Sequence, residues 1–263
     1  MDIIVCLKQV PDTTKVKMNP DGTLLRSGVP SILNPSDHFA LAKALEIKKQ
    51  TGATIKVLSM GPAQAQKILR LALALGADQA YLLCDKAFAG SDTWATAYAL
   101  ACAIKKITPF DLILCGQMAI DGDTAQTGPG IAGQLNIAQI TFCEDIKITS
   151  ANTLLATKLI DNGHQILEAS LPVLITLGTP HNFVLPYPDF KAIFKAQQKP
   201  LFIWTPADIQ ADITKLGLSG SPTRVVKIYP PALKQKGKIV NLSAEQTALK
   251  IAEILKAQKV GKL

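Results

Sequence analysis

The sequence predicts an α/β fold in which a parallel β-sheet carries helices on both faces. Short apolar runs alternate with longer segments whose apolar residues recur every three or four positions, a pattern typical of buried strands and of the helices that cover them. Of the 263 residues, 48% are hydrophobic and only 5% aromatic, so we expect a well-filled core rich in Ala, Leu and Ile. The strand-like runs are residues 2–7, 54–60, 80–84, 111–115 and 173–177.

Signals for helix starts lie between these runs. The segment Asn34-Pro35-Ser36-Asp37 offers capping residues and an acidic first turn, which predicts a helix that ends near Gly52. Gly61-Pro62 predicts a second helix with proline at its first position, and Ser91-Asp92-Thr93 predicts a third. The apolar residues 131–135 predict a fourth helix.

The later part of the chain predicts an antiparallel hairpin and then an arm. Residues 140–148 and 153–160 are extended in pattern, and 165–171 pairs back across a turn at 161–163. Eight prolines follow between residues 178 and 231, and secondary structure is expected to be sparse until Ser243. There a Ser-Ala-Glu-Gln capping box opens an amphipathic helix. A proline-rich segment with one helix buries no core alone, so we expect a domain over 1–180 and an arm over 181–263 that packs on another subunit.

The stretch from Gly116 to Ala132 links an apolar strand to a helix through small residues. Loop amides and the free N–H groups of a first helical turn make an anion site. The stretch matches neither a GxGxxG fingerprint nor a Walker A loop, and alone it suits an ordinary turn equally well. The segments 6–8, 60–62 and 90–93 also end parallel strands, so four loops converge on one crevice. This convergence favours a nucleotide site.

The composition argues against other classes of function. The net charge is +8, but no basic run is interleaved with aromatics, so we expect no nucleic acid; an acidic protein partner or an anionic cofactor suits the charge equally well. No apolar run reaches the ~18 residues of a membrane span. The five cysteines form no CxxC pair and the three histidines are scattered, so we expect reduced thiols, no metal site and a cytoplasmic location.

A protein-borne catalytic site is not expected. The sequence contains no GxSxG nucleophile motif. Asp121 and Asp123 are two residues apart in a glycine-flanked loop, where orienting a helix start or binding a ribose is a better interpretation than acid–base catalysis. The sequence therefore suits a carrier whose chemistry belongs to a cofactor.

Six segments together resemble the β subunit of electron-transfer flavoprotein, in matching order and spacing over nearly the whole chain. They are VCLKQVPDT (5–13), NPSD (34–37), GPAQAQ (61–66), AIDGDTAQTGP (119–129), LEASLPVLIT (167–176) and LGLSGSPTRVVKIYPP (216–231). The resemblance implies a Rossmann-like adenine-nucleotide-binding domain, an αβ heterodimer with the arm wrapped around the α subunit, and an acyl-CoA dehydrogenase-type flavoprotein as partner.

The resemblance also implies site residues. In simpler members the β crevice holds AMP and the α subunit holds the FAD, whereas in electron-bifurcating members β carries a second FAD that NADH reduces. Leu185 matches the hydrophobic anchor that docks on the dehydrogenase, although the basic cluster after it is thinned to Lys195-Ala-Gln-Gln-Lys199. The implied nucleotide contacts are Cys6, Asn34, Pro35, Ser36, Asp37, Met60, Asp121, Gly122, Asp123, Thr124, Ala125, Gln126, Thr127, Gly128, Pro129 and Ala132.

The subtype is indicated by the segment Ala87–Leu100, which with DGDTAQTGP resembles bifurcating members. Asp92 and Thr93 begin a helix aimed at the crevice, and its amides add a second phosphate-facing end. Because a dinucleotide has two phosphates where AMP has one, we hypothesise FAD in this subunit, with Asp92 and Thr93 as contacts. Electrons would pass between NADH or ferredoxin and the dehydrogenase. The alternatives are a non-bifurcating subunit with structural AMP, and a free-standing nucleotide-binding regulatory domain.

Overall fold

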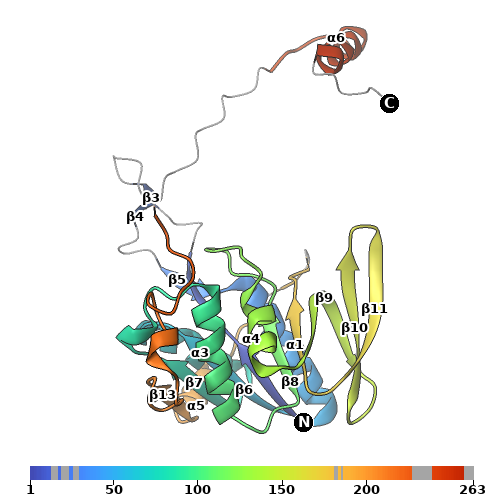
Figure 1. Cartoon of the computed structure of the whole chain (residues 1–263). Coiled ribbons are helices and arrows are strands. Elements are labelled where there is room, and N and C mark those ends of the chain that lie inside the picture. The colour runs from blue at the N-terminus through green and yellow to red at the C-terminus, as the bar shows by residue number, and fades with distance from the viewer. Residues whose placement is uncertain are drawn as a thin grey trace. The chain divides into compact units, whose positions relative to one another are not determined.

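The computed structural model describes residues 1–12, 17–18, 24–25, 30–180, 183–184, 186–226 and 239–257. It divides into two units, Met1–Ile228 and Tyr229–Leu263, which we treat separately. The first unit is built on a nine-stranded sheet (Figure 1). Its strands are β1 (Asp2–Cys6), β6 (Thr54–Met60), β7 (Gln79–Leu83), β8 (Leu112–Gly116), β9 (Ala138–Ile148), β10 (Thr153–Ile160), β11 (Gly163–Ser170), β12 (Val173–Leu177) and β13 (Leu201–Trp204).

The strand order is β11-β10-β9-β12-β8-β1-β6-β7-β13. Neighbouring strands in the series β9-β12-β8-β1-β6-β7-β13 pair in parallel. At the other edge, β10 pairs antiparallel with both β9 and β11. The hairpin turn falls at Asp161-Asn162, between β10 and β11. The predicted α/β class, the parallel sheet and the antiparallel edge hairpin are thus confirmed.

Helices cover both faces of the sheet. The helices of the first unit are α1 (Pro35–Thr51), α2 (Gln66–Leu75), α3 (Thr93–Lys106), α4 (Thr127–Leu135) and α5 (Phe190–Ala196). Buried residues of α1 and α2 form one core with alternate side chains of the strands, such as Ile3 and Val5. Those of α3 and α4 form a second core with the intervening side chains, such as Ile4 and Leu58. Adjacent strand residues therefore serve opposite cores, as the period of a strand requires.

Two local details differ from the prediction. Pro62 does not lie inside the first turn of α2, because its extended backbone precedes a 3₁₀ turn over Ala63–Ala65. Asn34 stands at the N-cap of α1 but makes no side-chain capping bond, because its amide binds another loop, described below. Asp92 does cap α3, since its carboxylate accepts a hydrogen bond from Ala95 N at 3.0 Å.

The expectation of sparse structure after residue 177 was wrong for residues 190–204. Strand β13 extends the sheet by pairing with β7. The ring centroids of Phe202 and Trp204 lie 5.2 and 4.6 Å, respectively, from the ring centroid of Tyr81. Helix α5 is fixed to α2, because Arg70 Nη1 donates to the carbonyl oxygens of Ala196 and Lys199. The compact unit thus includes the first part of the expected arm.

The described chain also contains shorter strands and a helix in the second unit. Strands β2 (Gln9–Pro11) and β5 (Ser31–Leu33) pair antiparallel, as do β3 (Lys17–Met18) and β4 (Leu24–Leu25). In the second unit, α6 (Ala244–Ala257) begins with the predicted capping box, since Gln246 N donates to Ser243 Oγ and Ser243 N to Gln246 Oε1, both at 3.3 Å. Among the described residues, no helix has the length and apolar character needed to cross a membrane.

Candidate functional site

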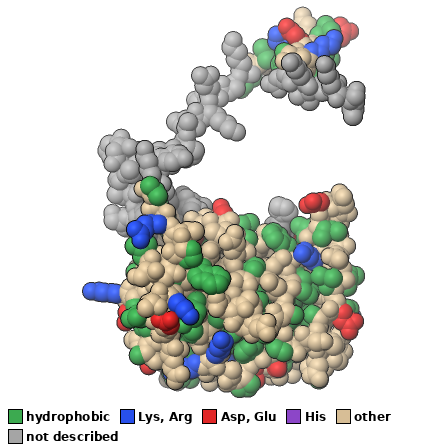
Figure 2. All heavy atoms as spheres, in the orientation of Figure 1, with side chains coloured by type: hydrophobic (Ala, Val, Ile, Leu, Met, Phe, Trp, Pro, Cys, Tyr) green, Lys and Arg blue, Asp and Glu red, His purple; other side chains and the backbone are tan. Residues whose placement is uncertain are grey.

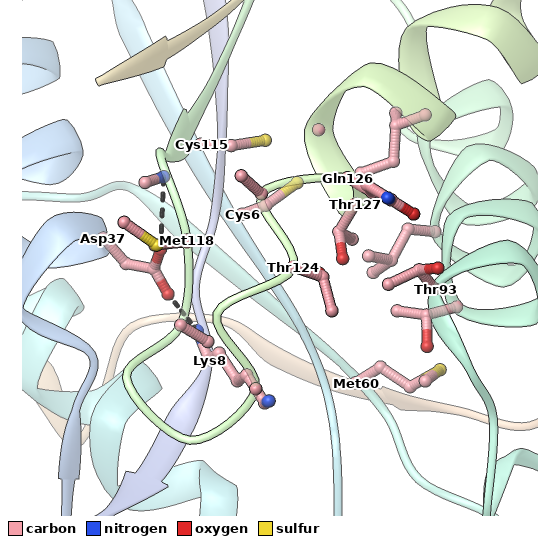
Figure 3. A pocket seen from close by; sticks show the side chains of 18 of the residues that line it. Cys6, Lys8, Asp37, Met60, Thr93, Cys115, Met118, Thr124, Gln126 and Thr127 are labelled. Carbon is pink, nitrogen blue, oxygen red and sulfur yellow. Dashed lines mark hydrogen bonds between the residues drawn. The ribbon is translucent and has the colours of Figure 1, made fainter. Parts of the chain in front are cut away.

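A cavity of about 530 Å³ lies at the carboxyl ends of β1, β6 and β8, beside the first turns of α3 and α4. Figure 3 shows side chains from these separate elements gathered around it. Ligand crevices of open parallel sheets lie at this edge, because the loops that leave the strands meet there. The chain segments predicted to converge therefore do so.

The floor of the cavity is apolar. Cys6 and Cys115 are register partners on β1 and β8, and both line the cavity together with Leu58, Leu100 and Ile131. A hydrogen bond with Cys6 and burial raise the pKa of the Cys115 thiol well above its usual range. The Cys115 thiol is therefore neutral at physiological pH, and this floor suits a flat, uncharged ring system better than an ion.

Asp37 joins two of the strand ends beneath the cavity. Its Oδ2 accepts from Lys8 N at 2.6 Å and its Oδ1 from Gly116 N at 3.1 Å (dashed in Figure 3). Burial raises the pKa of Asp37 to about 7, although hydrogen bonds from Asn34, Lys8 and Gly116 oppose the shift. A Cβ on Gly116 would lie 2.6 Å from Asp37 N, so this contact requires glycine.

The loop after β8 is held in a defined shape. Asn34 Nδ2 donates to Met118 O at 3.0 Å, and Asn34 Oδ1 accepts from Ile120 N at 3.2 Å. Lys8 Nζ forms an ion pair with Asp121 at 2.7 Å. Further along the loop, Asp123 and Ala125 have φ values of 48° and 53°, a left-handed conformation that costs a non-glycine residue roughly 1–2 kcal/mol. Unfavourable backbone at a cavity wall is typical of functional loops.

Two helix starts face the cavity from the other side of this loop. Thr93 and Thr96 lie one turn apart in α3, and Gln126, Thr127 and Gly128 begin α4. First-turn amides have no partners within their own helix, and the helix dipole favours anions there. The hydroxyl groups of Thr93, Thr96, Thr124 and Thr127 belong to residues that line this side of the cavity.

Asp92 is engaged by its neighbours. Its Oδ2 accepts from Thr223 N at 2.9 Å and from Thr223 Oγ1 at 2.8 Å, in addition to the capping bond on Oδ1. Desolvation raises its pKa, but hydrogen bonds from Ala95, Thr223 and Trp94 outweigh it, so the pKa of Asp92 lies below its ordinary value. The carboxylate is thus ionised, and its negative charge is stabilised by N–H and O–H donors.

The structure places most of the expected nucleotide contacts at this cavity, and the binding role of each stays a prediction. Those that line it are Cys6, Asp37, Met60, Asp92, Thr93, Gly122, Asp123, Thr124, Ala125, Gln126, Thr127 and Gly128. Those that do not are Asn34, Pro35, Ser36, Asp121, Pro129 and Ala132.

Four of these six residues have other contacts or positions in the fold. Asn34 and Asp121 hold the loop through the bonds above, and Ala132 is fully buried in α4. Ser36 lines a second hollow of about 560 Å³, bounded also by Phe142, Leu159 and Pro180. The expected docking residue Leu185 lies outside the described residues.

Sequence reasoning missed several lining residues. Thr96 follows Thr93 by three positions, so helical spacing was a sufficient signal for it. Lys8 belongs to the segment 6–8 that was predicted to reach the crevice, but it was not singled out as a contact. Thr223 and Val225 also line the cavity, but they come from a segment ~130 residues after Asp92, and nothing in the local pattern places them there.

The fold and this site define a class of α/β proteins with a small-molecule crevice at the carboxyl edge of a parallel sheet. The family model for the electron transfer flavoprotein domain matches residues 21–209. Electron transfer flavoprotein subunit beta of Thermoanaerobacterium thermosaccharolyticum is 45% identical over 262 residues, which cover 99% of this chain and all of the relative.

Two further relatives have other names. CarD, a subunit of the caffeyl-CoA reductase-Etf complex of Acetobacterium woodii, is 45% identical over 246 residues, covering 91% of this chain and 92% of the relative. Protein FixA of Bradyrhizobium diazoefficiens is 45% identical over 257 residues, which cover 94% of this chain and 88% of the relative. The chain therefore belongs to the electron transfer flavoprotein family, as a β subunit that takes part in electron transfer. The resemblance found in the sequence is confirmed.

Proposed function

We propose that this β subunit pairs with an α subunit and carries an FAD in the cavity. Electrons would pass through it between NADH or ferredoxin and an acyl-CoA dehydrogenase-type flavoprotein, in a bifurcating complex. The observation that carries the proposal is that the starts of two helices, α3 and α4, line one cavity. A dinucleotide brings two phosphates to such a site and AMP brings one, so the second helix start favours FAD.

The residues present fit a bound dinucleotide. The cavity volume of about 530 Å³ lies in the range of roughly 300–1,000 Å³ found for small-molecule sites. Lys8 is the only Lys or Arg among the described residues that line it, so phosphates would be held by amides and by the hydroxyls of Thr93, Thr96, Thr124 and Thr127. Helix starts bind phosphates in this way without a cationic partner.

The apolar floor supplies the complementary part of the site. Leu58, Leu100 and Ile131 belong to the core beneath the cavity or border it, and their side chains would exclude water from a ring system placed on them. Raising the pKa of Asp37 to about 7 also limits negative charge in the cavity lining. A bound flavin would supply the electron-transfer chemistry, while the chain supplies binding, orientation and electrostatics.

The charge distribution and the relatives support the partners proposed. Figure 2 shows Lys and Arg side chains lying apart from one another on one face of the first unit, without a continuous basic patch there, in keeping with protein partners and not with nucleic acid. The relative CarD is named as a subunit of a caffeyl-CoA reductase-Etf complex, which supports an acyl-CoA dehydrogenase-type partner for this chain.

The proposal is tested with hydroxyl-deleted variants of the purified αβ complex. Thr93→Val and Thr127→Val each remove one hydroxyl donor, and each should weaken FAD binding in the β cavity about tenfold, because hydrogen bonds to charged groups contribute roughly 1.5–3 kcal/mol. Thr54→Val, at the exposed first residue of β6 and so at the opposite edge of the sheet, is the matched control and should leave it unchanged. Unaltered FAD binding in both cavity variants would contradict the placement, and an unaltered flavin absorbance on adding NADH would contradict the donor.

A further inference from the structure

Residues 216–226 are fixed against the loop that precedes α3. Leu216 is buried in the core under α3. Gly217 N donates to Ser91 Oγ at 3.1 Å, and Leu218 N donates to Ala89 O at 3.1 Å. Gly217 has a φ of 57°, and a side chain there would meet the carbonyl oxygen of Ala87. The course of this segment is therefore determined by contacts with residues 87–91.

The next residues are tied to the helix start itself. Asp92 N donates to Ser221 Oγ at 2.8 Å, and Ser221 Oγ donates to Gly217 O at 2.7 Å. Thr223 gives both its N–H and its hydroxyl to Asp92 Oδ2. Asp92 thus caps α3 through one carboxylate oxygen and binds Thr223 through the other, so its side chain links the helix start to residue 223.

This junction lies at the cavity wall and near the end of the first unit. Thr223 and Val225 line the cavity beside Asp92 and Thr93, and the compact unit ends at Ile228. The segment that leads on toward α6 therefore contributes the wall of the site before it leaves the first unit. A ligand in the cavity can contact Thr223 and Val225 only when this segment occupies this position at the cavity wall.

We propose that Asp92 and Thr223 form a latch, which seats residues 221–226 as a wall of the nucleotide cavity, so that bound nucleotide and the seated segment stabilise each other. Asp92 is then a positioning residue and not the nucleotide contact expected from the sequence. The inference rests on the proposed nucleotide site. The coupling between nucleotide and segment is reciprocal. If bound nucleotide holds residues 221–226 in place by a given factor, breaking the latch lowers nucleotide affinity by the same factor.

The chain contains its own reporter for the latch. Its arginines are Arg26, Arg70 and Arg224, so an arginine-specific protease that cuts after Arg224 reports release of the residue next to Thr223. Arg70 lies in α2, where its guanidinium is bound to Ala196 and Lys199, and cutting there serves as the internal reference for general unfolding. Mass spectrometry separates these fragments from those of the α subunit.

The experiment uses the full αβ complex without added nucleotide and with saturating FAD, or AMP in a parallel reaction. Thr223→Val keeps the backbone bond and removes the hydroxyl bond, whereas Thr223→Ser keeps both and is the matched control. Asp92→Ser retains an N-cap residue but does not reach Thr223. Nucleotide binding is measured by equilibrium titration on the same samples, so binding and protection are read independently.

We expect nucleotide to slow cutting after Arg224 in the wild type and in Thr223→Ser by about tenfold or more, with no change at Arg70. In Thr223→Val the protection should be largely lost and nucleotide affinity should fall by about tenfold, the contribution of one hydrogen bond to a charged group. Asp92→Ser loses both bonds to Thr223, so its protection should also be largely lost and its affinity should fall at least as far. Binding without protection in the wild type, or protection that survives both variants, would overturn the latch alone. Absence of nucleotide binding to the wild type would overturn the latch and the proposed function together.

Discussion

At the scale of single residues, Asp37 links two of the chain segments that form the cavity. It is buried and accepts hydrogen bonds from the backbone at the ends of β1 and β8. A group in such a position holds the two loops at a fixed separation, and it does so at the expense of burying a carboxylate. The sequence marked Asp37 as a first-turn acid of a helix, and only the tertiary structure shows that it joins two strands.

The raised pKa of Asp37 predicts a specific pH dependence of stability. Its pKa rises from 3.8 in the unfolded chain to about 7 in the fold, so the folded state binds the proton more tightly. The stability that this proton contributes is full below pH 3.8 and is lost as the pH rises to about 7. The unfolding free energy of the wild type, relative to Asp37→Asn, should therefore fall by roughly 2.5 kcal/mol between pH 5 and 8.

This difference is measured by urea unfolding of both proteins across that range. The subtraction removes groups that titrate identically in the two proteins. A difference that stays constant from pH 5 to 8, or that grows with pH, would show that Asp37 keeps an ordinary acidity in the folded chain.

At the scale of elements, α4 depends on glycines for its close approach to its neighbours. A Cβ on Gly128 would lie 2.6 Å from Thr176 Cγ2 on β12, and one on Gly130 would lie 2.8 Å from Ala97 Cβ on α3. A Cβ on Gly133, later in the same helix, would meet nothing within 4 Å. The first two glycines therefore set how deeply the start of α4 enters the site, and the third serves no packing role.

Alanine substitutions in α4 should accordingly act in opposite directions. Gly133→Ala should raise the unfolding free energy by about 0.5–1 kcal/mol, because alanine favours the helix over glycine. Gly128→Ala should lower it by roughly 1–3 kcal/mol, since the added methyl overpacks the contact with β12. Thermal unfolding of the two variants checks this, and two changes of the same sign would be inconsistent with the packing described.

At the scale of the whole molecule, the second unit presents an amphipathic helix. The described side chains of α6 are exposed, including Leu249, Ile251, Ile254 and Leu255. Exposed apolar side chains at helical spacing are typical of helices that bind a partner surface. That the α subunit covers this surface stays a prediction from the family.

The role of α6 is tested by changing two neighbouring residues to glutamine and comparing the stability of the αβ complex. Ile251→Gln removes an apolar side chain from the proposed interface and should weaken the αβ complex about tenfold, in line with the loss of one buried aliphatic group. Lys250→Gln removes only a surface ion pair with Glu253, which contributes little. Gel filtration over a dilution series distinguishes them, and equal behaviour of the two variants would exclude α6 from the interface.

Elements that depend on a local sequence pattern were predicted, whereas elements that depend on contacts with distant residues were missed. The apolar runs and the caps at Asp92 and Ser243 identified strands and helix starts, because each signal lies within a few residues of the element it forms. Strand β13 was missed because its four residues follow a proline, and they become a strand only against β7, ~120 residues earlier. Thr223 was missed for the same reason, since Asp92 is what brings it to the cavity.

The central claim is that the cavity of this subunit holds FAD. The most direct measurement is the cofactor content of the αβ complex, purified without added nucleotide and then denatured. We predict two FAD per heterodimer and no AMP, since the starts of α3 and α4 would each face a phosphate of the dinucleotide. One FAD per heterodimer, with one AMP released on denaturation, would contradict it.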